Sequence, residues 1–148
     1  MTPKDGLWFI GDCLALSVNP ERSYSIKQII NSGNIDWKLL VYLSSNQLVL
    51  PAFYLNLKRN SLLSGLSKNL ISHFEYLTYL NRARNHKILI QIKHISELLW
   101  EKGLSPIYIK GAAHLVDGLY EDIAERMLSD IDILLGEESV DNTFSHML

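Results

Sequence analysis

The chain has 148 residues, enough to bury one hydrophobic core and to form one domain with a small helical subdomain. Apolar residues make up 47% of the chain and charged residues 20%, which is ordinary for a soluble globular protein. Fourteen basic and sixteen acidic residues give a net charge of −2, so composition predicts no general attraction to nucleic acid or to an anionic membrane.

The single cysteine, Cys13, lies in an apolar stretch, where a packed thiol is favoured over a catalytic one. One cysteine excludes an internal disulfide and fits a reducing compartment, so we expect a cytoplasmic protein. The first residues predict no signal peptide, because Asp5, Gly6 and Asp12 interrupt any apolar core. No apolar run reaches the roughly eighteen residues that a membrane-spanning helix needs, so no membrane partner is expected.

The first hundred residues carry the apolar spacing of helices. Thr2 is a capping hydroxyl followed by Pro3, which predicts a helix from there to about Leu16. The expected buried face of this helix consists of Leu7, Trp8, Ile10 and Leu14.

Three short helices are predicted next, and we expect a stack of antiparallel hairpins. Ser23 or Ser25 caps the first, Asp36 caps the second, and the third covers residues 49–59 with Pro51 in its first turn. The expected buried face of the first of these consists of Ile26, Ile29 and Ile30.

The longest helical tract covers about residues 66–102 and ends at Gly103, a good C-cap. It is either one helix or two helices broken near residues 81–85. A small basic cluster within it could hold a triphosphate or an RNA backbone, but no aromatic stacking set accompanies it. A solvated helix face is therefore preferred, and nucleic acid is not an expected partner. The cluster consists of Arg82, Arg84, His86 and Lys87.

A short apolar run at residues 107–109 predicts a strand, and Lys110, Gly111 and Ala112 follow it. Small residues allow a backbone to approach a ligand closely. A helix over residues 112–120 would direct free N–H groups at an anion. The sequence therefore predicts a phosphate-binding turn here.

A second apolar run, residues 129–135, predicts a buried strand that carries Asp130 and Asp132. Side chains two positions apart on a strand share one face, so the two carboxylates would repel each other. A Mg²⁺ ion between them would relieve that repulsion. The alternative is a pair at the end of a strand, capped by local N–H groups.

These features occur in the order Lys110-Gly111-Ala112-Ala113, Tyr120, Arg126 and the strand from Asp130 to Leu135. This order resembles the motif region of the polymerase-β-like nucleotidyltransferase superfamily, in particular the bacterial branch often labelled "uncharacterised nucleotidyltransferase". The resemblance implies an α+β fold. Residues 1–104 would form a mostly helical region, and residues 105–148 the N-terminal portion of a nucleotidyltransferase-like core with a small sheet and a connecting helix.

The resemblance implies Mg²⁺-dependent transfer of a nucleoside monophosphate from a nucleoside triphosphate to the hydroxyl of an unknown acceptor. Asp130 and Asp132 would be catalytic metal ligands, and the backbone of Gly111 and Ala112 would receive phosphates. Lys110 and Arg126 would add positive charge near the triphosphate, although Arg126 could instead pair with acidic residues to hold the loop.

The chain departs from the family pattern in two ways. The superfamily more commonly has glycine or serine where Ala112 follows Gly111. Members also carry a third carboxylate on a later strand, for which this chain offers Glu137, Glu138 and Asp141 in the turn after the predicted strand. The site could be incomplete, in which case the chain is a non-catalytic module that binds a nucleotide or a protein. A shortened sheet would expose a strand edge that a second copy could cover, and a longer parent protein is compatible with the chain's end.

Overall fold

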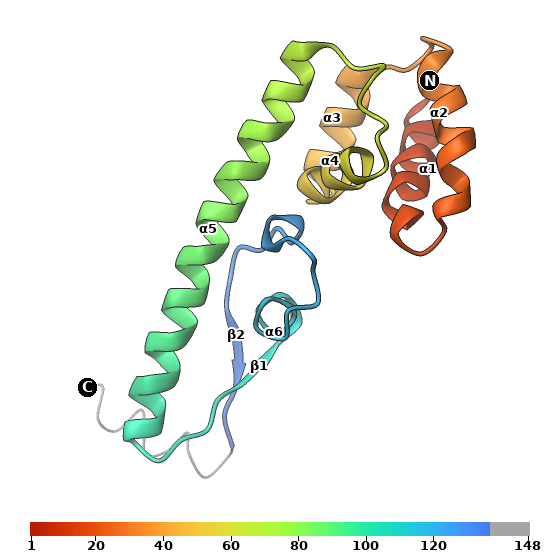
Figure 1. Cartoon of the computed structure of the whole chain (residues 1–148). Helices are drawn as coiled ribbons and strands as arrows, with labels where there is room; N and C mark the ends of the chain where they lie inside the picture. The colour runs from red at the N-terminus through yellow and green to blue at the C-terminus, as the bar shows by residue number, and fades with distance from the viewer. Residues whose placement is uncertain (137–148) are drawn as a thin grey trace. The chain divides into compact units, whose positions relative to one another are not determined.

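The computed structural model of the chain describes residues 1–136 (Figure 1). Most of these residues are helical, and the two strands described form one small antiparallel sheet, which confirms the predicted α+β class. Packing divides the chain into two compact units. Unit 1 contains Met1–Arg82 and Ala124–Met127, and unit 2 contains Ala83–Ile123 and the described residues from Leu128 to Gly136. The predicted domains, 1–104 and 105–148, stay a prediction.

Unit 1 is built from helices whose starts are largely set by capping. Thr2 caps α1 as predicted, since its hydroxyl accepts from the Asp5 N–H. Asp5 completes a capping box, because its carboxylate accepts from the Thr2 N–H. Asp36 caps α3 as predicted by accepting from the Leu39 N–H at 3.0 Å. The helices are α1 (Pro3–Leu14), α2 (Ser23–Asn31), α3 (Trp37–Asn46), α4 (Leu50–Arg59) and the first part of α5 (Lys68–Glu101).

The predicted buried face of α1 is wrong in part, because Trp8 is 68% exposed and Leu7 is also exposed. Phe9 and Cys13 are buried instead. The reason lies at Gly6, where an added Cβ would be 2.8 Å from a Leu43 methyl carbon. Gly6 therefore lets α1 approach α3 closely, and this contact turns the helix so that the opposite flank faces water.

Aromatic side chains from three helices form the centre of the unit 1 core. The Phe53 ring meets Phe9 edge-on at 6.4 Å between centroids and Phe74 at 6.1 Å, the geometry that aromatic pairs prefer. The Cys13 thiol is fully buried there, and burial raises its pKa, so the expected packed thiol is confirmed.

The predicted caps of α2 are wrong. Arg22 occupies the N-cap position, and the Ser25 hydroxyl donates to the Arg22 carbonyl at 2.8 Å. A 3₁₀ turn over Pro20–Arg22 leads directly into the helix, so the first helical residue needs no capping side chain. Ile26 is buried as expected, whereas Ile29 is exposed.

Helix α5 is continuous, so a break near residues 81–85 is excluded. It ends at the predicted glycine: Gly103 has φ +76°, and the Leu104 N–H donates to the Leu99 carbonyl at 2.9 Å. In the part of the chain that the structure describes, no helix combines the length and the apolar character needed to cross a membrane.

Unit 2 packs the second part of α5 with β1 (Ile107–Ile109), α6 (Lys110–Val116) and β2 (Asp132–Leu134). The strands pair antiparallel, with Ile107 opposite Leu134 and Ile109 opposite Asp132. The Tyr108 hydroxyl anchors β1 by donating to the Ile92 carbonyl at 2.9 Å. Trp100, near the end of α5, is 62% exposed. The buried residues of this small core are Ile88, Ile92, Ala112, Leu115 and Leu128.

Candidate functional site

The turn between β1 and α6 is tighter than the sequence predicts. Helix α6 begins at Lys110, two residues earlier than expected, and ends at Val116 instead of near residue 120. It ends there because Gly118, with φ +66°, reverses the chain. Gly111 and Ala112 are both buried, and Ala112 packs in the unit 2 core. Ala112 therefore has a packing role, and the role of both residues in phosphate binding stays a prediction.

Lys110 has an unusual backbone conformation, with φ +55° at the first residue of a helix. A side chain other than glycine in this left-handed region costs on the order of 1–3 kcal/mol, and such residues cluster at functional sites. The backbone of the turn after β1 is therefore strained at Lys110.

Strand β2 is shorter and less buried than predicted. The expected buried strand over residues 129–135 reduces to Asp132–Leu134, and Leu134 is exposed. Pairing stops where the three-residue β1 stops opposing it, so Asp130 precedes the strand. The predicted sharing of one strand face by Asp130 and Asp132 is consequently not a feature of this structure.

The register of the sheet brings Lys110 to Asp132. Asp132 lies opposite Ile109, the last residue of β1. Lys110, which follows Ile109, can therefore reach the Asp132 carboxylate, and its Nζ lies 3.0 Å from Asp132 Oδ1. The Lys110 side chain is 67% exposed and that of Asp132 only 28%. Asp130 is exposed, and its Oδ1 accepts from the Ser129 hydroxyl at 3.4 Å. Two predicted site residues, one cationic and one acidic, thus form a direct contact.

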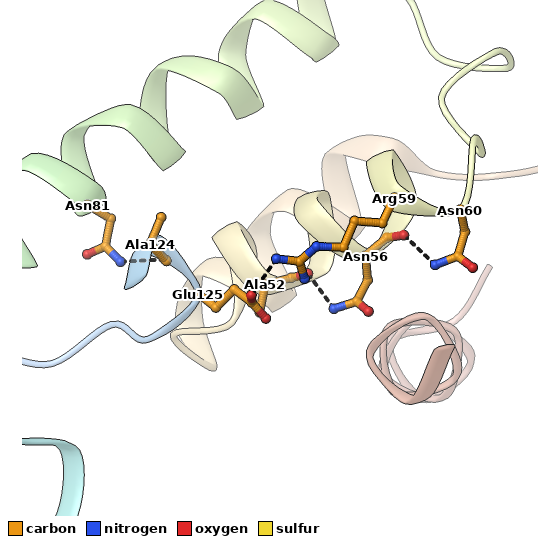
Figure 2. A network of polar contacts seen from close by, with 7 residues as sticks. All are labelled: Ala52, Asn56, Arg59, Asn60, Asn81, Ala124 and Glu125. Carbon is orange, nitrogen blue, oxygen red and sulfur yellow. Dashed lines mark hydrogen bonds and ion pairs between the residues drawn. The ribbon is translucent and has the colours of Figure 1, made fainter. Parts of the chain in front are cut away.

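Arg126, the remaining predicted site residue, belongs to unit 1, where its backbone is held from α5. Asn81 Nδ2 donates to the Ala124 carbonyl at 2.7 Å and to the Arg126 carbonyl at 2.9 Å. Glu125 accepts from Arg59 of α4 at 2.7 Å, in the polar network that Figure 2 shows. The role of the Arg126 side chain stays a prediction.

Sequence reasoning missed Asn81 and its neighbour Asn85, both of which are buried. Asn85 lies one turn later on α5 and donates to the Ile123 carbonyl. The spacing of the sequence does indicate that both are buried, since the two asparagines continue the row of inward-facing positions that runs along α5 from Phe74 to Ile88. A polar residue in such a row has to find a buried partner, and here the partners are carbonyl groups in and just after the 3₁₀ helix Ile123–Glu125, which precedes the Asp-x-Asp motif.

Asp130 and Asp132 each carry the type of ligand group that Mg²⁺ binds in proteins. Protein sites for Mg²⁺ commonly use one or two carboxylates, with water and substrate phosphates as the other ligands. Asp130 and Asp132 can provide these two carboxylates, both at least partly accessible to solvent. Within residues 1–136 there is no group of three or more histidine, cysteine or acidic side chains that could hold a metal. The other predicted carboxylates, Glu137, Glu138 and Asp141, lie outside the described residues.

The four residues of the predicted basic cluster on α5 do not share one environment. Arg84, His86 and Lys87 are exposed, as expected for a solvated helix face. Arg82 instead lines a cavity of about 220 Å³ in unit 1, together with Tyr54 and others. The Tyr54 hydroxyl donates to Glu75 at 3.0 Å, and burial raises its pKa. The cavity holds both charge signs, and it contains none of the predicted site residues.

Comparison with known families places these features in context. A family model described as "Uncharacterised nucleotidyltransferase" matches residues 33–148, which include most of the helices of unit 1 and all the predicted site residues. No match was found among curated proteins or among solved structures.

Proposed function

The chain belongs to the uncharacterised nucleotidyltransferase family, and on this basis we propose that it transfers a nucleoside monophosphate from a nucleoside triphosphate to an acceptor hydroxyl, with Mg²⁺ bound. The contact between Lys110 and Asp132 is the observation that supports it most directly. It joins the Lys-Gly motif to the Asp-x-Asp motif, although twenty-one residues of chain separate them.

The proposed roles follow from the chemistry of each side chain. Asp130 and Asp132 would hold the cation, which when bound would neutralise charge on the phosphates. Lys110 would contact the triphosphate, because its ammonium is a compact charge on a flexible and mostly exposed side chain. The backbone of Gly111 would approach the phosphates where a larger residue would block them.

The reaction needs in-line placement more than covalent help. The acceptor hydroxyl oxygen attacks the α-phosphorus, the bond from that phosphorus to the bridging oxygen breaks, and pyrophosphate leaves. The hydroxyl proton passes to a base, for which the candidates are Glu137, Glu138 and Asp141. Arg126 would add positive charge or pair with acidic residues, as the sequence predicts.

Calorimetric titration with ATP, GTP, CTP and UTP tests the nucleotide site. We expect the chain to bind at least one of them only when Mg²⁺ is present, and the Asp130→Asn, Asp132→Asn double variant to bind none. Asp117→Asn, which changes an exposed carboxylate after α6, is the matched control and should bind as the wild type does.

The outcomes separate two functions. Mg²⁺-dependent binding without transfer to any acceptor would favour the non-catalytic module. The absence of binding to all four nucleotides would contradict a working nucleotide site.

A further inference from the structure

We propose that Lys110 is an internal counter-ion that occupies Asp132 in the cation-free protein and must leave before this carboxylate can bind a metal. The proposal rests on the proposed function and adds regulation to the same site. It makes cation binding and the release of the Lys110 ammonium a single event. The released ammonium is then available to the phosphates of a nucleotide.

The first support is the geometry of the ion pair. Lys110 Nζ lies 3.0 Å from Asp132 Oδ1, which is an ordinary hydrogen-bond distance between two oppositely charged groups. Asp132 is the better shielded of the two, so its carboxylate gains more from a partner. The Lys110 side chain is mostly exposed, so its ammonium can move from the carboxylate into solvent at a small cost in free energy. Such a group is easily displaced by a metal ion.

The second support is the backbone at Lys110. In residues 1–136, two other non-glycine residues have positive φ, Leu48 and Ser61, and both lie in the turns that follow helices. Lys110 differs because it is the first residue of one, with φ +55°. Glycine would take this conformation without strain, but glycine has no ammonium group. The chain thus places a charge where the backbone favours glycine, directly beside Asp132.

A counter-ion of this kind has opposite effects on two ligands. Removing the ammonium should strengthen the binding of a free cation, since the carboxylate no longer has an internal partner. The same change should weaken the binding of a nucleotide with Mg²⁺, because the phosphates lose a positive contact. A purely structural Lys110 would not move the two affinities in opposite directions.

The test measures Mn²⁺ binding by electron paramagnetic resonance on the full chain, comparing the wild type with Lys110→Met and Lys110→Arg. We expect Lys110→Met to bind Mn²⁺ about two- to fivefold more tightly, the range set by an exposed ion pair. Lys110→Arg keeps the charge and should stay near the wild type. Lys102→Met removes an exposed lysine of the same unit and is the control for general electrostatics. Circular dichroism verifies that each variant is folded.

The results separate the inference from the function on which it rests. If the wild type binds Mn²⁺ and Lys110→Met binds it no more tightly than Lys102→Met, the counter-ion role is wrong while the metal site stands. If neither the wild type nor Lys110→Met binds Mn²⁺, the metal site fails and the inference fails with it. Tighter Mn²⁺ binding together with weaker Mg²⁺-ATP binding in Lys110→Met would establish the role.

Discussion

Two glycines differ at the residue scale in what the backbone requires of them. Gly103 ends α5 with φ +76°, whereas Gly11 lies inside α1. An added Cβ would meet nothing within 4 Å at either position. Any difference between alanine substitutions at these two sites is therefore a property of the backbone alone.

Gly103→Ala should lower the free energy of unfolding by about 1 kcal/mol, because alanine is strained at positive φ. Gly11→Ala is the matched control and should raise it by ~0.5–1 kcal/mol, because alanine favours the helix. Urea unfolding monitored by circular dichroism measures both changes. Equal effects of the two substitutions would contradict the role of Gly103 as the cap of α5.

At the site, the sequence predicts which residues come together better than it predicts their backbone conformation. Motif order predicts Lys110, Asp130 and Asp132 as site residues, and the structure brings Lys110 and Asp132 into contact. The strained backbone of Lys110 could not be predicted, since a lysine gives no signal of positive φ. The packing role of Ala112 was missed for a related reason, because a small residue suits a ligand turn and a tight core equally.

At the scale of elements, side-chain amides of α5 bind the carbonyl groups of the 3₁₀ helix Ile123–Glu125 and of the residue after it, ahead of the Asp-x-Asp motif. Asn81 donates to two carbonyl groups, those of Ala124 and Arg126, and is itself buried. Buried carbonyls that lose their donors pay the cost of desolvation. The helix therefore contributes to the conformation of this segment through hydrogen bonds as well as through apolar packing.

Asn81→Ala should consequently destabilise the protein by about 1–3 kcal/mol, the cost of leaving buried polar groups without partners. Asn69→Ala changes an exposed asparagine near the start of the same helix and should alter stability by less than about 0.5 kcal/mol. Thermal and urea unfolding of the two variants provide the comparison. Similar stability of Asn81→Ala and Asn69→Ala would show that these hydrogen bonds contribute little.

Element ends were predicted best where a side chain or a glycine sets them, as at Thr2, Asp36 and Gly103. The buried side of α1 was predicted poorly, because close approach at Gly6 carries no hydrophobic signal. The length of β2 was also missed, since pairing depends on how much of β1 lies opposite it and not on its own composition. Local side-chain chemistry thus determines where helices begin and end. Tertiary contacts determine which face of a helix is buried and how long a strand is.

At the scale of the whole molecule, the chain forms two compact units, each with its own core. The larger core belongs to unit 1 and is aromatic at its centre, whereas unit 2 has a small core under the sheet that carries the Lys110–Asp132 pair. The family match runs through both units. We therefore expect function to require both units.

The measurement that tests the account most directly follows the fate of labelled ATP with Mg²⁺ and a panel of hydroxyl-bearing acceptors, including the protein itself. We predict that label at the α-phosphate is transferred to an acceptor and that label at the γ-phosphate leaves as pyrophosphate. The Asp130→Asn, Asp132→Asn double variant should neither transfer the α-label nor release labelled pyrophosphate. Transfer of the γ-label would instead indicate phosphoryl transfer. Either that result or transfer of the α-label that persists undiminished in the double variant would contradict nucleotidyl transfer at this carboxylate pair.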